Sequence, residues 1–320
     1  MNQSFSGELA KPEKIHFLLI PEFSMIALSS ILEPLRIANR FGGSLYEWIL
    51  VGESMEPVHA SNGVAIQVSM SIDQVEEATL VFVCSSFNPK CYLSPAIRSW
   101  LRKLDRQGVT LGALDTGIYF LSDAGLVGKE KVTLHWEQIP CYLEEYPNAS
   151  ISTELFEVAP HRMYCAGGTA GIDMMLYKIM QEHDQRLALN ISEQLLLSRI
   201  RTHSEHQRLE ISKRHNIFNK RLATAIMHME NNIEAPLSID VLAASTHISC
   251  RQLERLFKSS FNETPTNFYL RLRLNRAKSL LRETDLSIAE ISIATGFDLV
   301  SYFSRAYRNL FKQTPKSERK

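Results

Sequence analysis

Two segments near the C-terminal end of the sequence share one plan. Residues 287–315 have the pattern of a short helix, a turn at Gly296 and a second helix, and residues 237–265 have the pattern of a short helix, a break and a second helix. The first segment along the chain ends in ETP and the second in QTP. An internal repeat of this kind arises by chance far less often than a single copy, so the sequence predicts a duplicated helix-turn-helix motif.

The second helix of each segment combines an apolar stripe with a basic, hydroxyl-rich face. The stripe of the last helix comprises Phe297, Phe303, Tyr307, Leu310 and Phe311, and that of the earlier helix comprises Leu253, Leu256, Phe257 and Phe261. Side chains off the stripes can reach base edges and phosphates, although a single basic amphipathic helix is equally typical of a solvated surface. The repeat favours DNA contact, with the basic helical residues 266–285 as a spacer that sets the two helices about one DNA turn apart.

Charge divides the sequence into two parts of opposite sign. The whole chain of 320 residues has 35 Lys and Arg against 35 Asp and Glu, but residues 201–320 hold 20 basic and 12 acidic side chains. Only the C-terminal part therefore suits a polyanion such as double-stranded DNA.

The C-terminal hundred residues resemble the AraC/XylS family of transcription regulators. The resemblance rests on the run Ser249, Arg251, Leu253, Arg255 and Phe257, on RLRLNRAKSLL at 271–281, and on SIAEISIATGF followed by SYFSRAYRNLF. It implies that base contacts come from two sets of residues, which are Arg251, Gln252, Glu254 and Arg255 in the first recognition helix and Val300, Ser301, Tyr302, Ser304 and Arg305 in the second. Glu254 departs from a basic pattern, because a carboxylate can accept only from cytosine and repels phosphate; it could instead pair with Arg251 or Lys258 within the helix.

The N-terminal part alternates between apolar runs and helical patterns. Strands are predicted at 15–20, 46–52, 79–86 and 108–115, with helices at 24–41 and 94–108 and a further β segment and helix over 151–183. This alternation predicts an α/β domain with a doubly wound, flavodoxin-like parallel sheet, followed by an all-α domain with the two helix-turn-helix motifs. Ligands of such sheets lie beyond the carboxyl ends of the strands.

The turn GALDTGIYFLSDAGL at 112–126 resembles the nucleophile elbow of class I glutamine amidotransferase or PfpI-like proteins. With LHWE around His135 and AGGTAGIDMML from residue 166, it makes residues 14–190 resemble the amidotransferase-like domain of the GlxA branch of AraC-type regulators. The enzymes carry cysteine at the elbow, whereas this chain carries Asp115. Because amidase chemistry of that type uses a thiolate, the substitution argues against an enzyme.

A carboxylate at the elbow instead suits a cationic ligand, especially beside aromatic rings. Glu33 is a second expected carboxylate, Phe23, Phe87, Trp136 and Tyr119 are expected to form an aromatic wall, and His135, Thr116, Asn88 and Thr169 are expected to complete the site. The alternatives are ordinary: the aromatic residues could be core packing, His135 a buried hydrogen-bonded histidine, and Asp115 a helix N-cap. By resemblance, regulators of this branch with the same DTG elbow respond to amino-acid-derived amines such as glycine betaine, carnitine or arginine.

The expected organisation is a loose tail at 1–13, the ligand-sensing domain at 14–190, a helix and linker at 191–219 and the DNA-binding domain at 220–320. Leu195, Leu196 and Ile200 are expected either to form a homodimer surface or to dock on the sheet. The expected partners are DNA, a small cationic metabolite and, for an activator of catabolic genes, RNA polymerase. We expect neither a cofactor nor a metal ion.

Five cysteines without paired spacing fit a reducing cytoplasm, and the absence of a long apolar run argues against a membrane span. The competing hypothesis is a cysteine-dependent hydrolase or deglycase fused to a DNA-binding domain, with Cys84 or Cys91 as nucleophile.

Overall fold

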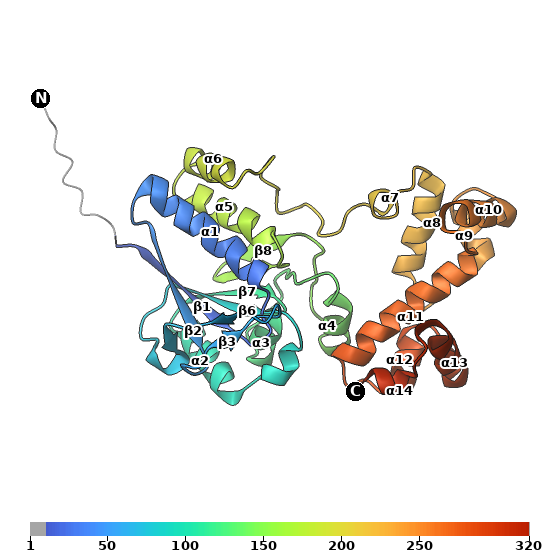
Figure 1. Ribbon diagram of the computed structural model, residues 1–320, viewed down its shortest axis with the longest axis horizontal. Helices are drawn as coiled ribbons and strands as arrows, with labels where there is room; N and C mark the ends of the chain where they lie inside the picture. The colour runs from blue at the N-terminus through green and yellow to red at the C-terminus, as the bar shows by residue number, and fades with distance from the viewer. Residues whose placement is uncertain (1–10, 320) are drawn as a thin grey trace, which may run out of the picture. The chain divides into compact units, whose positions relative to one another are not determined.

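The computed structural model describes residues 11–319, and the chain divides into two compact units, Met1–Gln207 and Arg208–Lys320 (Figure 1). The loose tail predicted at 1–13 falls mostly outside the described residues. The boundary between the units lies inside the segment predicted as a linker. None of the helices within residues 11–319 is long and apolar enough to cross a membrane.

The N-terminal unit is built on a seven-stranded sheet with the order β5-β2-β1-β6-β7-β9-β8. All neighbouring strands are parallel except β8, which pairs antiparallel with β9. The four apolar runs predicted as strands form its centre. The strands are β1 (Glu13–Leu19), β2 (Tyr46–Gly52), β5 (Met70–Ser71), β6 (Leu80–Ser85), β7 (Thr110–Asp115), β8 (Phe156–Ala159) and β9 (Arg162–Cys165).

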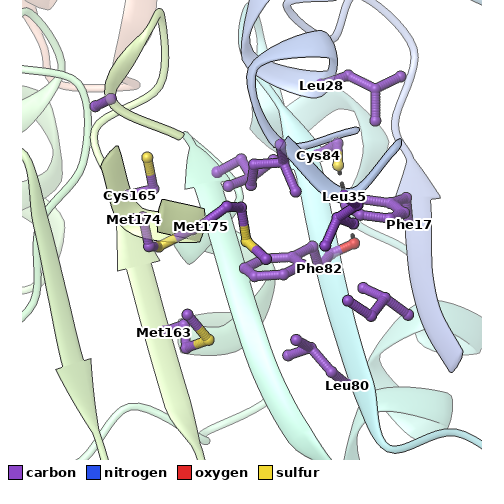
Figure 2. Packing of buried hydrophobic residues seen from close by; sticks show 14 of the residues in the cluster. Phe17, Leu28, Leu35, Leu80, Phe82, Cys84, Met163, Cys165, Met174 and Met175 are labelled. Atoms are coloured by element: carbon purple, nitrogen blue, oxygen red, sulfur yellow. Dashed lines mark hydrogen bonds between the residues drawn. The ribbon is translucent and has the colours of Figure 1, made fainter. Parts of the chain in front are cut away.

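Helices cover both faces of this sheet, which confirms the predicted doubly wound α/β class (Figure 1). One face packs against α1 (Met25–Gly42), α5 (Ala170–Glu182) and α6 (Gln185–Gln194). Figure 2 shows the core on this side, where the rings of Phe17 and Phe82 stack with centroids 5.7 Å apart. The opposite face packs against α2 (Pro95–Arg106) and α3 (Ile118–Asp123).

Several short elements of the N-terminal unit were not predicted. They are β3 (Val58–His59), β4 (Ala65–Ile66), the 3-10 helices η1 (Ile72–Gln74) and η2 (Pro89–Tyr92), and α4 (Ile139–Glu145). Strands β3 and β4 form a separate antiparallel pair.

The helix predicted at 191–200 is displaced along the chain. It begins at Gln185, because Asp184 caps it by accepting a hydrogen bond from the amide of Leu187, and it ends at Gln194, so residues 195–200 are not helical. Beyond this helix, Leu195 and Ile200 pack against the core of the N-terminal unit, whereas Leu196 is 91% exposed. The docking alternative therefore holds for two of these three residues.

The C-terminal unit is entirely helical and carries both predicted helix-turn-helix motifs. The first motif is α9 with α10, and the second is α12 with α13. Its helices are α7 (Ile211–Arg214), α8 (Lys220–Asn231), α9 (Ile239–Ser245), α10 (Cys250–Phe261), α11 (Pro265–Glu283), α12 (Ile288–Ala294), α13 (Val300–Phe311) and α14 (Pro315–Glu318).

The two motifs match in local detail. Each recognition helix, α10 or α13, has 12 residues and ends in a left-handed residue, Asn262 with φ 57° or Lys312 with φ 61°. In each copy a threonine then caps the next helix, and proline follows at its first position. The ETP and QTP segments therefore play the same role in the two motifs: each links the end of the recognition helix to the start of the next helix.

The copies differ in what holds the recognition helix from behind. In the first copy Phe257 meets Phe268 edge to face, with centroids 5.2 Å apart. In the second copy the equivalent positions are Tyr307 and Glu318, and the Tyr307 hydroxyl donates to Glu318 Oε2 at 2.9 Å. Arg282 also donates to this carboxylate, at 2.6–2.7 Å. An aromatic pair in one copy is therefore replaced by a hydrogen-bonded, charged cluster in the other.

We expect Gly296→Ala to destabilise the second motif. Gly296 has φ +73°, and an added Cβ would lie 2.6 Å from Pro236 Cδ and 2.7 Å from the Ile233 carbonyl oxygen. The left-handed backbone alone costs an alanine about 1–2 kcal/mol, and the clash with backbone adds to this. The melting temperature of the full chain should fall clearly.

The matched control is His247→Ala at the turn of the first motif, where a non-glycine residue already has φ 56°. This change should move the melting temperature little. Equal effects of the two substitutions would contradict the argument from Gly296.

Candidate functional site

The predicted elbow is a sharp strand-to-helix turn at the end of β7. Asp115 is its apex and has a left-handed φ of 58°, and α3 begins three residues later at Ile118. A Cβ at Gly117 would clash with the carbonyl oxygen of Val83, so only glycine fits at that point of the turn. Non-glycine residues in this region of backbone space are strained and cluster at functional sites.

The Asp115 carboxylate is almost enclosed, with 7% of the residue exposed. Ser86 Oγ donates to Asp115 Oδ2 at 3.0 Å. Burial raises the pKa of Asp115 to about 7, the hydrogen bond from Ser86 opposes this rise, and the charge of Glu137 adds to it. Asp115 is therefore a carboxyl group that changes charge near neutral pH and stays ionised most readily when a cation accompanies it.

A glycine pair closes one side of the elbow. Gly167 and Gly168 have φ values of 87° and 57°, and an added Cβ at Gly167 would lie 2.9 Å from Cβ of Asp115. Thr169 follows as the N-cap residue of α5, and its Oγ1 accepts a hydrogen bond of 2.9 Å from Arg201 Nη2. The backbone thus approaches Asp115 closely here, and the predicted ligand residue Thr169 is held by an arginine.

The loop that contains His135 and Trp136 is the second segment that the sequence predicted for the site. Their rings lie 5.6 Å apart, and Trp136 is 36% exposed. Burial lowers the pKa of His135, while Glu137 opposes this. The charge of Glu137, the residue after Trp136, also contributes to the raised pKa of Asp115. An exposed indole and a buried carboxylate are both side chains that suit an organic cation.

Three predicted ligand residues do not face this site. Phe23 is 0% exposed and packs in the core under α1, and Tyr119 is 1% exposed with its ring 5.2 Å from that of Tyr142. Both belong to the core-packing alternative. The side chain of Glu33 is 45% exposed on α1, and its carboxylate accepts a hydrogen bond from Arg36 Nη2 at 2.6 Å on the solvent side.

Thr116 lies at the elbow, but its side chain is already engaged. The residue is 0% exposed, and its Oγ1 donates to the Ser86 carbonyl oxygen at 2.7 Å. It therefore fixes the end of β6 against the turn instead of facing a ligand.

Phe87 and Asn88 lie beyond the end of β6. Phe87 is 53% exposed, and Asn88, with φ 49°, donates from Nδ2 to Glu22 Oε2 at 2.8 Å. Glu22 follows β1 and itself has φ 64°. Ser86 and Glu22 lie in the segments directly after predicted strands, at 85–88 and 21–24, where ligand contacts were expected, but no role was assigned to either. Glu137 and Gly167 had no signal of their own beyond the motifs that contain them.

The cysteine candidates do not occupy the elbow. Cys84 is 2% exposed within the core drawn in Figure 2, and burial raises the pKa of its thiol. Cys91 is exposed on η2. A buried thiol with a raised pKa is a poor nucleophile, so the geometry gives the hydrolase hypothesis no support.

The predicted base-contacting residues lie on the two recognition helices. Arg251, Gln252, Glu254 and Arg255 are exposed on α10, and Val300, Ser301, Tyr302 and Arg305 are exposed on α13, with Ser304 half-buried. Gln252 also completes a capping box with Ser249. Within residues 11–319, Glu254 forms no ion pair with Arg251 or Lys258, so the intrahelical alternative is not formed.

Comparisons with known proteins agree with both halves of this picture. Residues 242–320 match the helix-turn-helix domain family. The chain is 46% identical to the HTH-type transcriptional regulator CdhR of Pseudomonas aeruginosa over 95% of this chain and 90% of that protein. It is 31% identical to the HTH-type transcriptional regulator GlxA of Rhizobium meliloti over 98% of each chain.

Solved structures match the N-terminal fold. An AraC family transcriptional regulator from Pseudomonas putida superposes with a TM-score of 0.54 at 23% identity, covering 57% of this chain and 100% of that one. Drosophila melanogaster DJ-1beta superposes with a TM-score of 0.51 at 15% identity, covering 59% and 100%. At these identities the likeness establishes the fold.

A DJ-1/PfpI-like sheet domain joined to a duplicated helix-turn-helix defines a DNA-binding transcription regulator. The similarity to CdhR and GlxA extends over almost the whole chain. The chain belongs to the AraC family, as the sequence motifs implied, and the similarity to GlxA agrees with the predicted branch. Double-stranded DNA is its partner.

Proposed function

We propose that this regulator senses a small cationic metabolite derived from an amino acid, of the betaine, carnitine or arginine class, and activates genes for its catabolism. The observation that carries the proposal is the carboxylate of Asp115, held at a strained elbow where the related enzymes have a nucleophile. It is nearly buried and lacks a cationic partner among the ion pairs of residues 11–319. A buried carboxylate without a counter-ion favours a ligand that brings one.

The proposal assigns separate roles along the chain. Residues 14–190 bind the effector, with Asp115, His135, Trp136, Phe87, Asn88 and Thr169 around it, and residues 220–320 bind DNA. Residues 191–219 connect the two. A homodimer would present its recognition helices to paired half-sites, and an activator would in turn contact RNA polymerase.

A direct test is calorimetry of the full chain with glycine betaine, carnitine and arginine as probes. One of them should bind and raise the melting temperature, since a ligand that binds the native state stabilises it by mass action. If none of the three binds, the effector class is wrong.

Binding should also depend on pH. A cation requires ionised Asp115, and because the pKa of this group lies at about 7, the apparent affinity should be about 10-fold weaker at pH 6 than at pH 8. A proton is released on binding below pH 7. Titrations in phosphate and Tris, whose ionisation enthalpies differ, measure that release. Equal affinity across this range with no proton release would show that Asp115 is not the counter-ion.

A further inference from the structure

The chain between α6 and the C-terminal unit is attached to the N-terminal unit by its own hydrogen bonds. The amide of Leu155 donates to the Glu205 carbonyl at 3.0 Å, and the amide of Gln207 donates to the Thr153 carbonyl at 3.0 Å. Glu154 and His206 form an antiparallel bridge between these bonds. We call residues 199–207 the strap; its last third pairs with the segment before β8 as an added strand would.

The first anchor of the strap is Arg201. Its guanidinium donates to Asp173 Oδ2 from Nε at 2.9 Å and from Nη2 at 2.6 Å, and its amide donates to Asp173 Oδ1 at 2.7 Å. Asp173 is 2% exposed on α5. The same Nη2 reaches Thr169 Oγ1 at 2.9 Å and its carbonyl at 3.0 Å. Arg201 thus neutralises a buried carboxylate and holds the turn that follows Gly167, the residue packed against Asp115.

The second anchor is Gln207. Its Nε2 lies 2.9 Å from Thr133 Oγ1, 2.9 Å from the Leu134 carbonyl and 3.1 Å from the Glu154 carbonyl. Its Oε1 accepts from the amide of Trp136 at 2.7 Å. The Gln207 side chain therefore bonds to Thr133 and Leu134 before His135 and to Trp136 after it.

The two anchors hold the two segments, here called walls, that the proposed function places around the effector. Thr169 follows the glycine turn that packs against Asp115, and Trp136 lies in the loop that contains His135. Gln207 is also the last residue of the N-terminal unit, and the C-terminal unit begins at Arg208. The tether of the DNA-binding unit therefore starts at a side chain that holds one of the segments proposed to bind the effector.

We propose that the strap couples the elbow site to DNA binding: a ligand that orders both walls fixes the strap, and loss of either anchor releases it and lengthens the free tether. This inference deepens the proposed function by naming the route of regulation. Arg201 and Gln207 act as positioning residues. Since coupling is reciprocal, a released strap should weaken ligand binding by the same factor by which the ligand favours the attached strap.

The attachment can be tested without a ligand by limited trypsin digestion of the full chain. Arg199 and Arg201 supply cleavage sites within the strap, and mass spectrometry identifies the cuts. Cleavage tracks the population of the open form when opening is fast. We expect Gln207→Ala and Thr169→Val to raise the cleavage rate at these sites about 10-fold or more. The matched control is Gln194→Ala, since Gln194 accepts only an exposed bond from Arg40 at 3.2 Å; it should cleave as the unaltered chain does. Unchanged rates in both strap variants would overturn the proposal.

The coupling is tested with glycine betaine, carnitine and arginine added to the same digestion. The probe that binds should slow cleavage in the unaltered chain and should bind Gln207→Ala about 5-fold or more weakly, within the usual range of coupling. A probe that binds without changing cleavage would overturn the coupling. If no probe binds while the anchor variants still open the strap, the effector class fails and the attachment stands.

Discussion

Replacing Arg305 by alanine should weaken binding to specific DNA by about 5- to 150-fold, the range expected for loss of one bidentate base contact. Arg305 is exposed on α13, and its guanidinium lies 5.6 Å from the ring centroid of Tyr302, three residues earlier on the same helix. It occupies the sixth position of its recognition helix, as Arg255 does on α10. Because the side chain is exposed, the melting temperature should not change.

The measurement is a fluorescence titration of an operator fragment recovered from random duplexes, repeated from 0.05 to 0.3 M salt. A base contact predicts a loss that is larger for the operator than for unrelated DNA, whereas a phosphate contact would weaken both alike and flatten the salt dependence. Arg221→Ala, which removes one charge from α8 outside both motifs, is the control. Operator affinity equal to that of the unaltered chain would remove Arg305 from the interface.

Replacing Asp115 by asparagine should abolish the response to a cationic effector. Removing one partner of a buried charge pair costs about 2–5 kcal/mol, so binding should weaken by about 30-fold or more. The substitution keeps the size of the side chain and its capacity to accept from Ser86. Glu33→Gln is the matched control: it makes the same chemical change at a carboxylate that lies in solvent, and it should leave binding intact.

The same variant should change stability with a definite sign. The pKa of native Asp115 is raised to about 7 from an ordinary value of 3.8. The native state therefore holds this proton more tightly than the unfolded chain, and stability falls as pH rises from about 4 to 7. Asparagine carries no such charge, so Asp115→Asn should gain stability over the original chain by on the order of 4 kcal/mol at pH 8 and by little at pH 4. Thermal melts between pH 4 and 8 measure this difference. A variant less stable than the original at pH 8 would contradict the buried, unpaired carboxylate.

Elements with a strong local pattern were predictable from the sequence. The central strands are continuous apolar runs, and the duplicated motif carries its caps, turn and exit in both copies. The region between β2 and β6 was missed because its elements are two or three residues long and lack a period. The start of α6 was missed because the cap at Asp184 lies before the leucine-rich stretch that drew attention to Ile191.

The elbow was predictable, but the surroundings of its carboxylate were not. The sequence places Phe23 after a strand without telling which way its ring points, and in the fold it points into the core. The sequence itself argued against placing Glu33 in the site, because Ile31, Leu35 and Ala38 mark the buried stripe of α1 and Glu33 lies off this stripe. Ser86 and Gly167 meet Asp115, and the strap meets Thr169 and Trp136, only through tertiary contacts between distant segments, which no local pattern records.

The residues that pack behind the two recognition helices differ, so the two helices should lose their positions under different conditions. Burial alone would raise the pKa of Glu318, yet the hydrogen bond from Tyr307 and the charge of Arg282 hold it below its ordinary value. Aromatic rings pack behind both helices, but only the second helix also depends on an ionised group. Protonation of Glu318 at low pH would therefore weaken the support of the second recognition helix and leave that of the first unchanged. Only one of the two helices would then remain firmly positioned to contact the operator.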